Sequence, residues 1–357
     1  TIAGANVTNV AVACTTNTYT VGGSVTGLAA GNSVVLRNNG GNDLTVAANG
    51  AFTFSTALLD QSAYLVTVFT QPTTPNQTCV VTNGSGTIAG ANVTNVAVAC
   101  TTNTYTIGGN VSGLAAGNNV VLRNNGGNDL NVVANGAFTF STALLDQSAY
   151  LVTVLTQPTT PNQTCVVTNG SGTLAGANVS NVTVTCTTTT YTVGGTVTGL
   201  AAGNNVVLRN NGGNDLNVTA NGAFTFTTPV ADGAAFAVTV FTPPTTPSQT
   251  CVVSNGSGTI AGANVSNVTV ACTISTFTIG GTVAGLAAGN NVVLRNNGGN
   301  DLNVAANGAF TFTTALTDQS VYAVTVFTQP TTPNQTCVVT NGSGTLAGAN
   351  VSNVTVT

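Results

Sequence analysis

The sequence contains no lysine, glutamate, histidine, methionine or tryptophan, and charged residues make up only 3% of its 357 positions. Ordinary globular proteins contain about 25% charged residues. Aspartates are the only carboxylates, so neither a Ser-His-Asp nor a Cys-His set can be assembled, and no carboxylate pair for acid–base chemistry is evident. We therefore expect a protein that is not an enzyme.

The few charges and the short apolar runs also argue against a nucleic-acid-binding protein and against a membrane-spanning segment. Four arginines without lysine cannot neutralise a phosphate backbone, so nucleic acid is not an expected partner. No apolar run approaches the roughly 20 residues that a membrane-spanning helix needs, so no membrane span is expected in this segment. A net charge of -4 gives little repulsion between copies, which favours association of the chain with itself.

The sequence repeats with a period of 86 residues, which the cysteines mark at Cys14, Cys100, Cys186 and Cys272, and again at Cys79, Cys165, Cys251 and Cys337. This period is too long for a solenoid unit and suits an independent small domain. We therefore expect tandem domains. Their boundaries are 1–14 for the last strand of a preceding repeat, then 15–100, 101–186, 187–272 and 273–357, the last without its final cysteine.

Each repeat has the pattern of an all-β domain. Apolar and polar residues alternate in short runs, Gly and Asn separate these runs, and no helical period is evident. About seven strands per repeat favour a β-sandwich. The expected strands of the first repeat are Thr18–Gly27, Ser33–Arg37 and Asp43–Ala47 around a five-residue NNGGN loop, AFTF after the Asn49-Gly50 turn, Tyr64–Thr70, and the segments around Cys79 and Cys100.

The motifs GGSVTGL, NSVVLR, ANGAFTF and YLVTV resemble β-sandwich domains of the Cna-B and carboxypeptidase-regulatory type, which are Ig-like or prealbumin (transthyretin)-like. The closing TCVVTNGSGT and NVTNVAVAC resemble tandem repeats of large bacterial surface proteins. This resemblance implies a spacer, stalk or fibre module outside the cell, at the bacterial cell surface. Cna-B-like pilus domains are often locked by an isopeptide bond from lysine, and the absence of lysine excludes that crosslink here.

Two cysteines per repeat in a β array indicate disulfides in an oxidising compartment. Zinc is not expected, because no C-x-x-C spacing and no histidine is present. One connectivity closes local hairpins and leaves Cys14 and Cys337 to pair outside this window: Cys79–Cys100, Cys165–Cys186 and Cys251–Cys272. The alternative ties each repeat to the preceding strand: Cys14–Cys79, Cys100–Cys165, Cys186–Cys251 and Cys272–Cys337. We prefer the local pairing, because the two segments read as adjacent antiparallel strands.

The segment Thr1–Cys14 duplicates the end of a repeat and has no domain of its own. One interpretation is a slice of a longer array, in which Cys14 and Cys337 find partners in flanking repeats. The other is a strand donated to the sheet of a neighbouring subunit, because an uncharged alternating strand is a good template for pairing. Both interpretations lead to a fibre.

Arginine and aspartate lie symmetrically about the glycines of the NNGGN loop, where we expect cross-strand ion pairs that fix the strand register: Arg37–Asp43, Arg123–Asp129, Arg209–Asp215 and Arg295–Asp301. A weaker alternative is a calcium site, with one carboxylate per site from Asp43, Asp129, Asp215 or Asp301 together with Asn oxygens. One carboxylate is few for Ca²⁺, which prefers several oxygen ligands.

Two other groups of residues have structural interpretations. Asp60 and its equivalents precede a strand, where a polar turn residue is expected. We expect Tyr19, Phe52, Phe54 and Phe69 to pack in the core or between domains rather than to form a sugar-binding platform.

Three functional hypotheses follow. The first, which we prefer, is a surface filament or stalk of disulfide-locked repeats that associates with itself, with strand donation as one route. The second is an adhesin or spacer stalk that binds a surface glycan or a host protein, with repetition giving avidity. The third is a surface array stabilised by calcium.

Overall fold

The computed structural model describes residue 4 and residues 6–357, and all of its regular structure is β. The chain divides into two compact units. The first comprises the residues up to Thr159 together with Gln163–Thr187, and the second comprises Thr160–Asn162 and Thr188–Thr357. Each unit contains two separate hydrophobic cores, and each core is built from the residues of one 86-residue repeat. The expected tandem all-β architecture is therefore correct.

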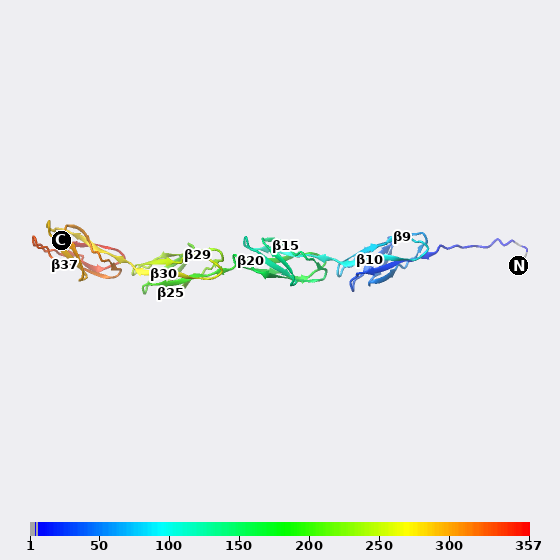
Figure 1. Ribbon diagram of the computed structural model, residues 1–357, viewed down its shortest axis with the longest axis horizontal. Helices are drawn as coiled ribbons and strands as arrows, with labels where there is room; N and C mark the ends of the chain where they lie inside the picture. The colour runs from blue at the N-terminus through cyan, green and yellow to red at the C-terminus, as the bar shows by residue number, and fades with distance from the viewer. Residues whose placement is uncertain (1–3, 5) are drawn as a thin grey trace. The chain divides into compact units, whose positions relative to one another are not determined.

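Every repeat is built from two four-stranded sheets and a short two-stranded ladder, and Figure 1 shows it as a body of paired strands. In the first repeat one sheet has the order β5-β2-β10-β8 and the other the order β4-β3-β7-β9, and β1 pairs with β6. The ten strands are β1 Thr18–Tyr19, β2 Val21–Thr26, β3 Val34–Asn38, β4 Asn42–Val46, β5 Gly50–Thr53, β6 Leu58–Leu59, β7 Ala63–Thr70, β8 Gln77–Thr82, β9 Ser85–Thr87 and β10 Val93–Thr102.

The other three repeats use the same arrangement. The second contains β11 Thr104–Tyr105, β12 Ile107–Ser112, β13 Val120–Asn124, β14 Asn128–Val132, β15 Gly136–Thr139, β16 Leu144–Leu145, β17 Ala149–Thr156, β18 Gln163–Thr168, β19 Ser171–Thr173 and β20 Val179–Thr188. The third contains β21 Thr190–Tyr191, β22 Val193–Thr198, β23 Val206–Asn210, β24 Asn214–Val218, β25 Gly222–Thr225, β26 Val230–Ala231, β27 Ala235–Thr242, β28 Gln249–Ser254, β29 Ser257–Thr259 and β30 Val265–Ile274. The fourth contains β31 Thr276–Phe277, β32 Ile279–Val283, β33 Val292–Asn296, β34 Asn300–Val304, β35 Gly308–Thr311, β36 Leu316–Thr317, β37 Val321–Thr328, β38 Val339–Thr340, β39 Ser343–Thr345 and β40 Val351–Val356.

The core lies between the two sheets, because alternate residues of each strand point inward. In the first repeat Leu36 and Phe54 are fully buried, and the Phe52 and Phe54 rings meet edge to face at 5.9 Å. Phe69 is the exception to the expected aromatic core, since 54% of its surface is exposed. A bulge in β7 at Phe69 explains this difference.

The strand pairing differs from the expectation in two places. The hairpin loop between β3 and β4 has three residues rather than five, because Asn38 pairs directly with Asn42. The segments around Cys79 and Cys100 do not form a simple hairpin either. They are adjacent antiparallel strands, but β9 lies between them in sequence and pairs with β7 in the opposite sheet.

Strand β10 also pairs with β2, and these two strands are parallel. Among the described strands, every repeat has one such parallel ladder, formed by β2 and β10 or by their equivalents. The close approach of the two strands requires glycine at position 23. A Cβ atom on Gly23 would lie 1.7 Å from the carbonyl oxygen of Val96, which is backbone that cannot yield. The GGSVTG motif thus reflects strand packing as well as turn formation.

The segment Thr1–Cys14 lies partly outside the described residues, at positions 1–3 and 5. Residues 6–14 form no strand, and Val7, Val10 and Val12 are 65–82% exposed. In the fourth repeat, β40 occupies the sheet position equivalent to β10.

Candidate structural site at the repeat junctions

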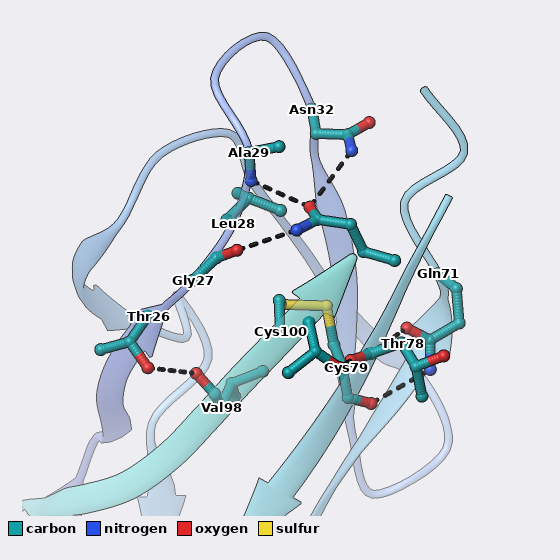
Figure 2. The surroundings of a disulfide bond; sticks show 12 residues. Thr26, Gly27, Leu28, Ala29, Asn32, Gln71, Thr78, Cys79, Val98 and Cys100 are labelled. Atoms are coloured by element: carbon teal, nitrogen blue, oxygen red, sulfur yellow. Dashed lines mark hydrogen bonds between the residues drawn. A yellow bond between two sulfur atoms is a disulfide. The ribbon is translucent and has the colours of Figure 1, made fainter. Parts of the chain in front are cut away.

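The loop after β7 is the part of a repeat that reaches the next one, and Gln77 anchors it. The Gln77 side chain is only 2% exposed. Its Oε1 accepts hydrogen bonds from the Ala29 backbone N–H (2.9 Å) and from Asn32 Nδ2 (3.2 Å), and its Nε2 donates to the Gly27 carbonyl (2.8 Å). Figure 2 labels the partners Gly27, Ala29 and Asn32 and marks these hydrogen bonds with dashed lines. Nε2 also donates to the Thr102 hydroxyl at 3.3 Å, so all four contacts of this amide lie inside the fold and give the loop that precedes Gln77 a fixed base.

The disulfide lies directly beside this loop (Figure 2). Cys79 and Cys100 are register partners on β8 and β10, and they are joined. Gln71 holds the same strand from the other side, because its Oε1 accepts from the Cys79 N–H (2.7 Å) and its Nε2 donates to the Cys79 carbonyl (3.1 Å). The same bond joins Cys165 to Cys186 and Cys251 to Cys272, whereas Cys337 is a buried free thiol and Cys14 an exposed one.

Within the first unit, the carboxylate of Asp146 links two repeats. One oxygen accepts the backbone N–H of Asn76 from the first repeat at 2.7 Å, and the other accepts the N–H of Gly176 from its own repeat at 2.8 Å. Asp146 is 5% exposed. The hydrogen bond from Asn76, with further help from Gly176 and Gln147, lowers the pKa of this carboxyl below its usual range despite the opposing effect of burial.

Three more contacts surround this carboxylate. The Asn103 N–H donates to the Asn76 carbonyl at 2.9 Å, and the Asp146 N–H donates to the Asn103 carbonyl at 2.8 Å. The Asn76 side chain donates to the Tyr105 hydroxyl at 3.3 Å. The loop of one repeat is thus held by the linker, by the Asp turn and by the first strand of the next repeat.

The second unit contains the same arrangement. Asp232 accepts from the N–H of Asn162 at 2.6 Å, and Asp318 accepts from the N–H of Ser248 at 2.7 Å. These hydrogen bonds, the first cause in each case, lower the pKa of both carboxyls. Ser248 stands where the other repeats have asparagine, so the junction depends on a backbone N–H and tolerates a change of side chain.

Asp60 is the equivalent residue of the first repeat and provides an internal comparison. Its Oδ1 accepts the Gly90 N–H at 2.8 Å, as in the other repeats. Within residue 4 and residues 6–357, however, no loop of a preceding repeat donates to it, and Asp60 is half-buried rather than buried. The turn assignment from the sequence is therefore accurate for Asp60, but it misses the second role of Asp146, Asp232 and Asp318.

The hairpin tip holds the expected arginine and aspartate side by side. Arg37 and Asp43 are register partners, with Nε–Oδ1 at 2.5 Å and Nη2–Oδ2 at 2.8 Å. The hydrogen bonds from Arg37 lower the pKa of Asp43. The same contact joins Arg123 to Asp129, Arg209 to Asp215 and Arg295 to Asp301.

The oxygen atoms that would bind calcium at this hairpin already accept other hydrogen bonds. Both oxygens of Asp43 are engaged by arginine, Asn38 Oδ1 accepts the Leu65 N–H, and the buried unpartnered atom nearby is a donor, Asn42 Nδ2. Across the described part of the chain, no three His, Cys, Asp or Glu residues gather as metal ligands.

Open hollows recur along one hairpin of the repeats. In the first repeat a cavity of about 360 Å³ lies along β4 and β5, and its lining, residues 44–53, carries no charge. No helix within the described residues has the length and apolarity needed to span a bilayer.

The chain matches no protein-family model, and no curated protein is significantly similar to it. Several solved structures are similar in strand arrangement. The Bacillus anthracis TIE protein is 10% identical, with 97% of this chain and 75% of that protein covered and a TM-score of 0.45. Two B repeat units of the collagen-binding protein of Staphylococcus aureus are 17% identical, with 95% and 99% covered and a TM-score of 0.26. A streptococcal ancillary pilin is 10% identical, with 71% and 99% covered and a TM-score of 0.23. Identities of 10–17% with TM-scores of 0.23–0.45 carry no inference about the function of this chain.

Proposed function

We propose that this chain is a structural, non-enzymatic segment of an extracellular filament or stalk at the bacterial cell surface. The observation that carries the proposal is the Asp junction. A buried carboxylate in one repeat accepts a backbone N–H from the preceding repeat, so consecutive domains are joined by more than the covalent linker. Such a contact restricts bending at the linker, which suits a stiff stalk better than a chain of freely moving domains.

The disulfides support the same function. They join β8 to β10, β18 to β20 and β28 to β30, and disulfides of this kind are typical of oxidising compartments. The sequence resemblance to bacterial surface repeats points to the same location.

Self-association of these segments is part of the proposal, and strand donation is one route to it. Residues 6–14 present exposed valines suited to strand pairing. The position that a donated strand would take in the fourth repeat is filled by β40, so donation would require β40 to leave.

The second candidate function is an adhesin or spacer that binds a glycan or a host protein. The uncharged cavity along β4 and β5 favours it, because the same cavity occurs in the first three repeats and repetition gives avidity. Phe69 does not provide an open stacking surface for a sugar, because the Arg37 guanidinium lies 3.3 Å over its ring.

Electron microscopy of surface material from the producing cells, with an antibody against this chain, tests the proposal. We expect labelled filaments, and non-reducing mass spectrometry should recover Cys79–Cys100 peptides from them. Labelled material that consists of discrete particles with free thiols would contradict the filament and leave the adhesin.

A further inference from the structure

Most charges of this chain lie on one sheet face in each repeat. The chain has twelve charged residues, of which eight form the Arg–Asp pairs on β3 and β4 and their equivalents. The other four are the aspartates at the turns described above. The outer face of the β5-β2-β10-β8 sheet carries only uncharged residues such as Ser24, Ala51, Val80 and Thr101. The two outer faces of the sandwich therefore differ in chemistry.

The charged face also carries an aromatic ring that a bulge turns outward. Val35 pairs with Thr70 and Leu36 with Val68, so Phe69 is the extra residue of β7. Bulges redirect side chains, and here the ring is 54% exposed beneath Arg37. Phe241 and Phe327 repeat this arrangement, at 51% and 53% exposure.

We propose that this face is a lateral contact between copies of the chain. We call it the Arg–Phe face and define it in the first repeat by Arg37, Asp43, Leu65, Thr67 and Phe69. The inference rests on the proposed filament and names the surface through which neighbouring filaments bind.

A second copy is the partner that fits the charges. The face presents one positive and one negative group that are hydrogen-bonded to each other within the chain, so a two-fold related copy can set this ion pair antiparallel to its own, with each Arg37 next to the Asp43 of the other chain. A strongly acidic or strongly basic partner would be repelled by one of the two groups. Exposed arginine and aromatic side chains are the types that contribute most to protein interfaces, and the low net charge leaves little repulsion between copies.

The second repeat provides an internal comparison. Leu155 replaces the aromatic ring there, and Arg123 is more exposed than Arg37, at 34% against 26% of its side chain. We expect this repeat to contribute least to the contact. Each chain still carries several such faces, so weak single contacts combine into a stronger one.

Sedimentation velocity of the oxidised 357-residue chain over a range of concentrations tests the proposal. The test variant changes Phe69, Leu155, Phe241 and Phe327 to Ser, and the matched control changes Val80, Val166, Val252 and Val338 to Ser on the uncharged face. These control valines are 58–61% exposed, so both variants remove exposed apolar groups. We expect roughly tenfold weaker association for the test variant and no change for the control.

Exchanging the charges tests whether the ion pairs direct the contact, independently of the loss of exposed apolar surface. One variant carries Asp at all four Arg positions, and a second carries Arg at the four paired Asp positions. Each alone should sediment as single chains, and their mixture should associate. A wild-type chain that never associates, a control as weak as the test variant, or a mixture that stays apart would overturn the proposal. Single-width filaments in microscopy would refute the lateral contact alone, whereas the absence of filaments would refute the proposed function.

Discussion

Glycine at position 23 allows the close approach of β2 and β10 on which the parallel ladder depends. The parallel pairing of β2 with β10 brings the Val96 carbonyl to 1.7 Å from any Cβ placed there, so no side chain can be accommodated. The sequence shows only a Gly-Gly pair in an alternating strand, which is why the close approach was not predicted.

Replacing Gly23 by Ala should therefore destabilise the first repeat by about 3 kcal/mol, since backbone must move to relieve the overlap. Gly41→Ala is the control, because nothing lies within 4 Å of its added methyl group. Denaturant unfolding of the two variants should show an earlier step for Gly23→Ala only. Equal curves would mean that the strands separate at little cost.

The carboxyl groups of the junctions determine a pH dependence. The folded pKa values of Asp146, Asp232 and Asp318 are lowered, so these groups stabilise the junction above their unfolded pKa of about 3.9. That contribution is lost as the pH falls through the folded pKa, because protonation weakens the carboxylate as an acceptor. We expect the melting temperature to decrease when the pH is lowered below about 4.

The variant with Asn at positions 146, 232 and 318 should have a lower melting temperature at neutral pH and lose less of it on acidification. Melting curves across pH check this. A variant whose acid sensitivity equals that of the wild type would show that other carboxyls control the transition, such as those paired with arginine.

At the level of strands, the disulfide ties β8 to β10 beside the junction loop. The double change Cys79→Ala and Cys100→Ala should lower the free energy of unfolding of the first repeat by about 3 kcal/mol, because the loop between them is no longer closed in the unfolded chain. The double change leaves no unpaired thiol. Unfolding measured in oxidising buffer checks the value, and a loss below about 0.5 kcal/mol would show that hydrogen bonds hold β8 in place without the crosslink.

The alternating patterns predicted the strands well, because one face of each sheet is buried. The Arg37–Asp43 register followed from symmetry about Gly40, and the structure places these residues opposite each other. The parallel β2–β10 ladder and the crossing of β9 could not be predicted, since they depend on contacts between segments far apart in sequence. The role of Asp146 was missed for the same reason, because its partner is a backbone N–H in another repeat that has no side-chain signature.

For the molecule as a whole, the repeated Asp junction is the central claim, and small-angle X-ray scattering of the 357-residue chain tests it most directly. The variant with Ala at Asp146, Asp232 and Asp318 is compared with Asp60→Ala, which removes the equivalent carboxylate where no preceding loop contacts it. We predict that the triple variant shows a broader distribution of interatomic distances than the wild type, while Asp60→Ala gives the same distribution as the wild type. Identical distributions for all three proteins would contradict the account, because the carboxylates would then fix nothing between repeats.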